Sequence, residues 1–99
     1  MPPSTEDIGA LDERPNWTVR NESATFAPVD GGWRAVVNPL REPTRRSRYH
    51  IAIVDRTGAT RYTREAASLD EAARTAERDV AARNALRLVR VLTNPGSAP

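Results

Sequence analysis

The sequence contains no cysteine and only one histidine, His50. Without cysteine the chain has no disulfide bonds, no thiolate zinc sites and no thiol catalysis. A single histidine likewise excludes metal sites built from several histidines, and Cys–His nucleophiles. Lysine is absent too, so all 15 basic residues are arginine. A GC-rich coding sequence explains this bias, so the choice of arginine does not by itself indicate a function.

Long apolar runs are also missing. No stretch approaches the roughly 18 apolar residues of a membrane span, and no charged-then-apolar beginning resembles a signal peptide. We therefore expect a soluble, cytoplasmic protein without a membrane partner. Large apolar side chains are few, since Leu, Ile, Val and Phe together number 18 and Ala alone numbers 15. This composition predicts one small domain with a thin core.

The sequence contains few of the residue patterns that are typical of catalytic sites. Ser47, His50 and Asp55 could form a nucleophilic triad only if folding brought them together, and His50 is more simply a strand residue on a solvated face. Carboxylate pairs in the expected helix are explained by capping and by surface ion pairs. No Walker, Rossmann or calcium-loop pattern occurs. We therefore expect a non-enzymatic protein that needs no cofactor and no metal.

The two ends of the chain differ in composition from its middle. Residues 1–14 contain two prolines and four acids without an apolar period, which predicts a disordered acidic arm. Residues 94–99, Asn-Pro-Gly-Ser-Ala-Pro, predict a disordered tail. The single folded domain is therefore expected over residues 15–93.

Short alternating segments within that domain predict an antiparallel sheet of three to four strands. Asp30-Gly31-Gly32 is typical of a tight turn, because glycine supplies a positive φ at no steric cost. Residues 17–20 are either a short strand or an entry segment. The clearer strand segments are residues 24–27, 33–37, 48–54 and 59–64.

The last two of these segments flank the turn at Asp55–Gly58 and predict a hairpin. Burial of Tyr49, Ile51 and Ile53 on one face requires a loop of two or four residues, which places Tyr62 and Thr60 over the core. The outer face of the hairpin then carries four polar side chains, those of Arg48, His50, Arg61 and Thr63.

A helix should cover one face of this sheet, giving an α+β fold. Ser68 and Glu71 match a capping box, and apolar residues follow Leu69 at helical spacing to about Arg83. Beyond Asn84 the helix either continues or gives way to a strand over residues 86–92. The lack of glycine or proline before Pro95 favours continuation. A continued helix would carry a rotated apolar stripe of Ala81, Ala85, Leu88, Val89 and Leu92.

Charge is distributed unevenly along the chain. Residues 33–64 contain eight arginines against Glu42 and Asp55, whereas the region 65–92 balances its charges. Aromatic residues are interleaved with these arginines, a combination that favours nucleic-acid binding. An alternative is that the arginines form a solvated loop and the aromatic residues belong to the core. The predicted binding residues are Arg41, Arg45, Arg46, Arg48, His50, Arg61 and Arg64.

A protein partner is the competing hypothesis. A short chain without catalytic groups suits an adaptor or inhibitor of the antitoxin or immunity type, which would bind through an edge strand. Such a protein would alternatively use the apolar stripe of the helix, or form a homodimer through it. The residues of that interface would be Ala85, Leu88, Val89 and Leu92.

Overall fold

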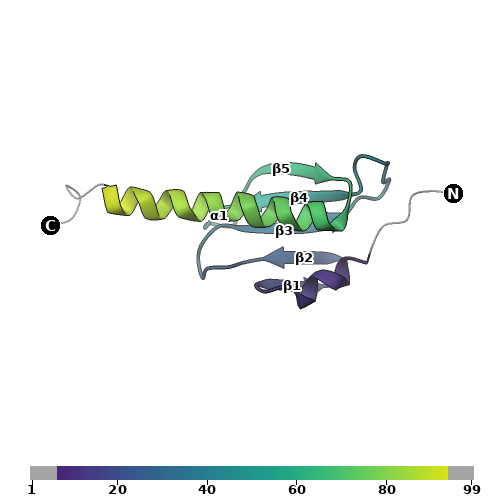
Figure 1. Cartoon of the computed structure of the whole chain (residues 1–99), viewed down its shortest axis with the longest axis horizontal. Coiled ribbons are helices and arrows are strands. Elements are labelled where there is room, and N and C mark those ends of the chain that lie inside the picture. Colours follow the sequence, from purple (N-terminus) through teal and green to yellow (C-terminus); the bar gives the residue numbers. More distant parts are fainter. Residues whose placement is uncertain (1–6, 94–99) are drawn as a thin grey trace.

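A computed structural model describes residues 7–93, with side chains up to Leu86. Five antiparallel strands form one sheet in the order β1-β2-β3-β4-β5, and a long helix lies across one face of it (Figure 1). The predicted α+β fold is therefore confirmed, with one strand more than expected because residues 17–20 pair fully with the next strand. The elements are η1 (Ile8–Glu13), β1 (Trp17–Arg20), β2 (Ser23–Phe26), β3 (Arg34–Pro39), β4 (Tyr49–Val54), β5 (Thr60–Ala66) and α1 (Leu69–Thr93).

The core lies between the sheet and α1. Strand alternation directs every second side chain of β2, β3 and β4 toward the helix. The helix contributes mainly small residues to this core, and its buried alanines let its backbone lie close to the sheet. The main core residues are Ala24, Phe26, Ala35, Val37, Tyr49, Ile51, Ile53, Ala66, Leu69, Ala72, Ala73, Ala76 and Val80.

The start of α1 is capped nearly as predicted. The Ser68 hydroxyl oxygen accepts a hydrogen bond from the Glu71 amide at 3.1 Å. The Glu71 carboxylate accepts in return from the Ala67 amide, also at 3.1 Å, one residue before the expected cap amide. Both bonds satisfy amides near the helix start that have no partner within the helix.

The β4–β5 hairpin has the predicted even register in its inner part, where Tyr62 lies opposite Ile53. A bulge between Ile53 and Val54 then shifts the pairing, so Thr60 lies opposite Val54 and is exposed. The prediction that Thr60 joins the core was therefore wrong. Alternation from Tyr62 also places Arg64 opposite Ile51, on the face toward the helix.

The prediction that the chain is disordered through residue 14 was wrong for residues 8–13, which form η1. Ile8 and Leu11 are 7% and 3% exposed and belong to the core, and the Asp7 carboxylate caps the segment through the Gly9 amide at 2.9 Å. Two apolar residues three positions apart are enough to bury one side of this short helix. Residues 1–6 and 94–99, where the rest of the arm and the tail were expected, lie outside the described part of the chain.

α1 continues through Thr93, so the alternative of a strand over residues 86–92 was wrong. Its 25 residues span about 37 Å, whereas a six-residue strand spans about 20 Å. The helix therefore runs past the edge of the sheet (Figure 1), and Ala81 and Ala85 on the predicted stripe are exposed. Among residues 7–93, no helix combines the length and apolarity that a bilayer span requires.

Candidate functional site

The loop between β3 and β4, residues 40–48, is called the arginine loop here. The Leu40 amide donates to the Arg48 carbonyl at 2.9 Å and closes the loop at its base. The Thr44 amide donates to the Ser47 carbonyl at 2.8 Å, and the Thr44 hydroxyl accepts from the amides of Arg46 and Ser47. The backbone and Thr44 thus shape this loop together with Arg48, whose guanidinium contacts the Thr44 carbonyl.

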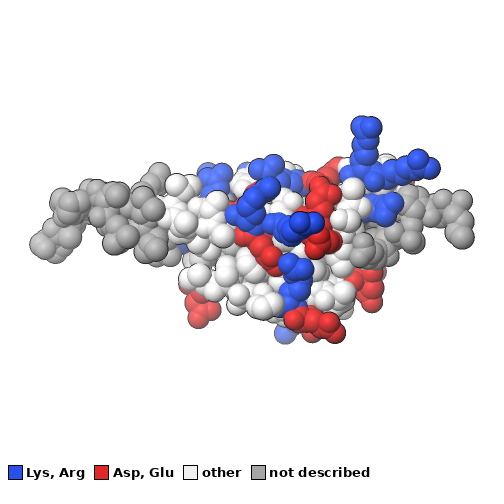
Figure 2. Space-filling model, in the orientation of Figure 1, with Lys and Arg blue, Asp and Glu red and all other residues white. Residues whose placement is uncertain are grey.

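Three guanidinium groups of the arginine loop extend from this frame. Arg41, Arg45 and Arg46 are exposed, and no acidic partner binds them among the described residues. Figure 2 shows blue side chains projecting from the end of the molecule where this loop lies. Arg48 is half-buried; its amide donates to the Ala66 carbonyl at 2.8 Å, and its Nε donates to the Thr44 carbonyl at 3.4 Å.

The other predicted binding residues are not all brought to this loop. His50 lies close to it, on the sheet face away from α1, opposite Asn38 and Glu65. Arg61 lies at the opposite end of the sheet, where its Nη1 is 3.3 Å from Asp55 Oδ2. The structure therefore groups Arg48 and His50 with the loop and separates Arg61 from it.

Asp55 organises the turn at that opposite end. Its Oδ1 accepts from the Thr57 hydroxyl and amide and from the Ala59 amide, at 2.6, 2.9 and 3.1 Å. The Thr57 hydroxyl bond is the largest of the effects that lower the pKa of Asp55, which falls to about 2 against the opposing effect of burial. Arg61 adds to this lowering, so its guanidinium is already paired with Asp55, although the Arg61 side chain is 60% exposed.

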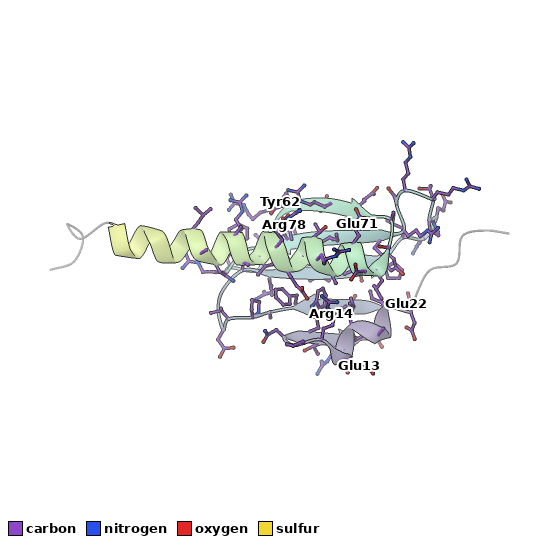
Figure 3. All side chains as sticks on the ribbon, in the orientation of Figure 1. Glu13, Arg14, Glu22, Tyr62, Glu71 and Arg78 are labelled. Atoms are coloured by element: carbon purple, nitrogen blue, oxygen red, sulfur yellow. The ribbon has the colours of Figure 1, made fainter. Side chains whose placement is uncertain are left out.

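Arg64 is engaged on the helix side of the sheet. Its Nε donates to Asp79 Oδ2 at 2.6 Å, and the same carboxylate accepts from the Tyr62 hydroxyl at 3.1 Å and from Arg78 Nε at 3.2 Å. Tyr62 and Arg78 lie beside each other where β5 meets α1 (Figure 3). Burial raises the pKa of Asp79, but the bonds from Arg64, Tyr62 and Arg78 outweigh it and the net pKa is lowered.

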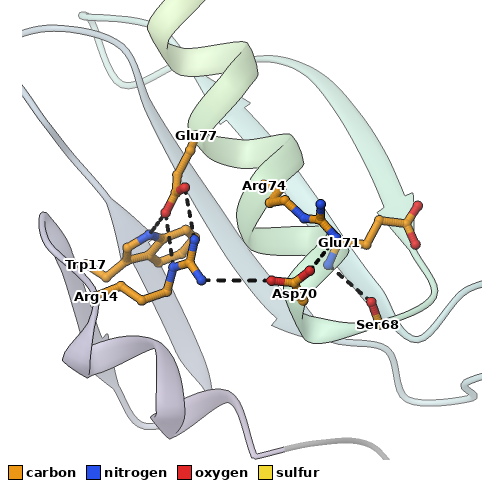
Figure 4. A network of polar contacts seen from close by, with 7 residues as sticks. All are labelled: Arg14, Trp17, Ser68, Asp70, Glu71, Arg74 and Glu77. Atoms are coloured by element: carbon orange, nitrogen blue, oxygen red, sulfur yellow. Dashed lines mark hydrogen bonds and ion pairs between the residues drawn. The ribbon is translucent and has the colours of Figure 1, made fainter.

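Two further arginines on the helix side, Arg14 and Arg74, also bind carboxylates. Arg14 Nε and Nη2 donate to Glu77 at 3.2 and 3.1 Å, and Trp17 Nε1 donates to the same carboxylate at 2.7 Å (Figure 4). The bond to Glu77 raises the pKa of Arg14 and ties η1 to the helix. Arg74 pairs with Asp70 one turn away, and Figure 2 shows red and blue side chains side by side on this face.

The aromatic side chains lie on the same side as α1. Trp17 and Phe26 are in contact, with ring centroids 5.3 Å apart, and Tyr49 is fully buried. Trp33 and Tyr62 pack against the core, and the Arg83 guanidinium lies over both rings at 5.2 and 5.4 Å. Interleaving of aromatic residues and arginines along the chain therefore does not place them on one surface.

The sheet face away from α1 is called the open face, because no described element covers it. Alternation puts Arg20 and Arg34 on this face, since their neighbours Val19 and Ala35 point to the core side. Arg56 lies in the β4–β5 turn. The sequence analysis did not select these three arginines, although the outward position of Arg34 follows from the same alternation that buried Ala35.

Within residues 7–93, no group of three His, Cys, Asp or Glu side chains is arranged to hold a metal ion. No protein-family model, curated protein or solved structure matches the chain.

Proposed function

We propose that the protein binds nucleic acid, without catalysing a reaction, through phosphate contacts from the arginine loop. The observation that supports this most is that the exposed arginines of the loop bind no carboxylate in the part of the chain that the structure describes, unlike several arginines elsewhere in the fold. Arg14, Arg64 and Arg74 on the helix side each bind a carboxylate, whereas the exposed arginines of the loop bind none among the described residues. An arginine free of intramolecular partners can offer its fork of N–H donors to a phosphate.

The shape of the loop adds to this argument. Because Thr44 and backbone bonds hold the loop, the side chains of Arg41, Arg45 and Arg46 have no large structural task. Arg41, Arg45 and Arg46 therefore form the proposed contact, with Arg48 and His50 at its border. Arg61 and Arg64 are left out of the proposal because their charges hold Asp55 and Asp79.

The test is fluorescence anisotropy with a labelled random-sequence DNA at several salt concentrations. The double variant Arg45→Ala/Arg46→Ala should lower the affinity and reduce the slope of log K against log salt by about two, since each lost phosphate contact removes about one. Arg74→Ala/Arg78→Ala is the control, because it removes two charges that are 74% and 69% exposed on the helix side; since Arg78 also binds Asp79, this variant is assayed well below its own unfolding midpoint. Equal loss in both variants, or no binding at micromolar protein in low salt, contradicts the proposal.

A protein partner is the second candidate, and the projecting part of α1 favours it. Leu86 on that part is 57% exposed, and Val29 in the β2–β3 loop is 51% exposed. A contact through this helix would leave the arginine loop unused. Sedimentation of the wild type and of Leu86→Asp tests self-association: a concentration-dependent dimer that Leu86→Asp abolishes supports this candidate, and a monomer at all concentrations removes the homodimer.

A further inference from the structure

The open face has a neutral centre. Thr18, Thr25, Val36, Ala52 and Thr63 are cross-strand neighbours that run in one row from β1 to β5. Their side chains are short and uncharged, and by alternation they point away from α1. The middle of this face is therefore a floor of short side chains without charge.

Basic side chains stand at both ends of this floor. Arg20 is at the same end as the arginine loop, because its partner Ser23 is hydrogen-bonded to Asn38 near the end of β3. Arg34 and Arg56 are at the other end, where a methyl group on Gly58 would lie 3.5 Å from the Arg34 guanidinium. None of these three arginines has an ion-pair partner in the described part of the chain.

The distance between the two basic ends follows from strand geometry. Leu40, the first residue of the arginine loop, is six positions beyond Arg34, which corresponds to about 20 Å along an extended strand. The major groove of B-form DNA is about 12 Å wide. Arginines at both ends of the floor can therefore reach phosphates on both sides of such a groove, with the neutral row between them.

The open face offers no platform for base stacking. Trp17, Phe26, Tyr49 and Tyr62 all point to the core side, and Trp33 packs against that core as well. Proteins that hold single strands without sequence preference gain about 1–3 kcal/mol for each base stacked on an aromatic ring. A face with charge but no aromatic ring therefore favours a ligand whose bases are already stacked within a duplex.

From these observations, and resting on the proposed function, we infer that the ligand is a double-stranded nucleic acid lying across the open face. The arginine loop contacts phosphates at one end, and Arg34 and Arg56 contact phosphates at the other. Glu65 is exposed on the open side of β5, so the phosphate contacts lie over β2, β3 and β4 rather than at the β5 edge. Recognition through phosphates at both ends predicts little dependence on base sequence.

The experiment compares duplex and single-stranded DNA probes of equal length, about 20 nucleotides, by anisotropy. We expect the wild type to bind the duplex at least about tenfold more tightly. Arg34→Ala/Arg56→Ala should weaken duplex binding and lower its salt slope by about two, while its thermal unfolding midpoint stays close to that of the wild type. Arg74→Ala/Arg78→Ala again serves as the control.

The outcomes separate this inference from the function on which it rests. Duplex preference together with a selective loss in Arg34→Ala/Arg56→Ala supports the inference. Binding of single strands as tight as that of the duplex overturns it and leaves the arginine loop as the binding site, as does duplex binding that this variant does not change. Failure to bind either probe refutes the proposed function, and the inference with it.

Discussion

Asp79 should be one of the most sensitive positions for the stability of this fold. Its side chain is 8% exposed and accepts bonds from Arg64, Tyr62 and Arg78, thereby joining β5 to the middle of α1. Asp79→Asn keeps the size of the side chain and nearly the same helix propensity. The substitution removes the negative charge and inserts N–H donors where the site supplies donors already.

The cost can be estimated from the partners. A hydrogen bond to a charged group contributes about 1.5–3 kcal/mol, but Arg64 and Arg78 are 50% and 69% exposed and regain water when their partner is lost. We therefore expect Asp79→Asn to lower the free energy of unfolding by about 2 kcal/mol. In a domain of this size that shifts the thermal midpoint down by roughly 8–16 °C.

Thermal unfolding followed by circular dichroism measures this difference. Asp30→Asn is the matched control, because Asp30 is exposed and makes no hydrogen bond or ion pair with the described residues. The folded pKa of Asp79 is below that of the unfolded chain, so its contribution is complete above about pH 4 and declines at lower pH. Equal thermal midpoints for Asp79→Asn and Asp30→Asn at pH 7 would refute the assigned role of Asp79. A difference between these midpoints that grows toward pH 3 would refute it too.

Two further predictions concern the β4–β5 turn and the β2–β3 loop, at the end of the sheet opposite the arginine loop. Asp55→Asn should lower the unfolding midpoint at neutral pH. The difference in midpoint from the wild type should shrink between about pH 4 and pH 2, because the folded pKa of about 2 means that the stabilising carboxylate is protonated only as the pH falls through that window. Measuring the unfolding midpoint of both proteins over this pH range checks the prediction. Gly32→Ala should cost about 1–3 kcal/mol, since the added methyl group meets the Asn84 side-chain oxygen at 2.9 Å. The same Asn84 oxygen accepts a hydrogen bond from the Trp33 amide at 3.0 Å, so urea unfolding compares Gly32→Ala, Asn84→Ala and the double variant. The cost of Gly32→Ala should be smaller when residue 84 is already alanine.

The hairpin shows what alternation could and could not predict. Burial of Tyr49, Ile51 and Ile53 fixed the face of Tyr62, as the structure confirms. The same parity also places Arg64 on that face, because residues 62 and 64 point the same way in a strand. Arg64 was predicted to bind nucleic acid from the excess of arginine in its region, whereas strand register places it on the helix side. Only its partner Asp79, fifteen residues away on the helix, was beyond the reach of a sequence pattern.

The prediction of a disordered N-terminal segment was wrong for a different reason. Its acids and prolines are typical of disorder, and its two buried residues, Ile8 and Leu11, are too few for a periodic signal. The contact that secures it is Arg14 with Glu77, 63 residues away in the sequence. A pairing of this kind depends on how the helix is placed over the sheet, and composition contains no information about that placement.

In the proposed function, the distribution of acids, rather than the number of arginines, determines where the protein attracts phosphate. The net charge of +2 is small because thirteen carboxylates offset fifteen arginines, yet several of those carboxylates are spent on holding β5, η1 and the helix together. Arg64, bound to Asp79, is thus a structural residue whose loss should lower stability. Arg45 and Arg34 have no such task, so their loss should lower binding and leave stability nearly unchanged. This separation of the arginines into two sets is what the proposed function predicts, and a general excess of basic residues would not produce it.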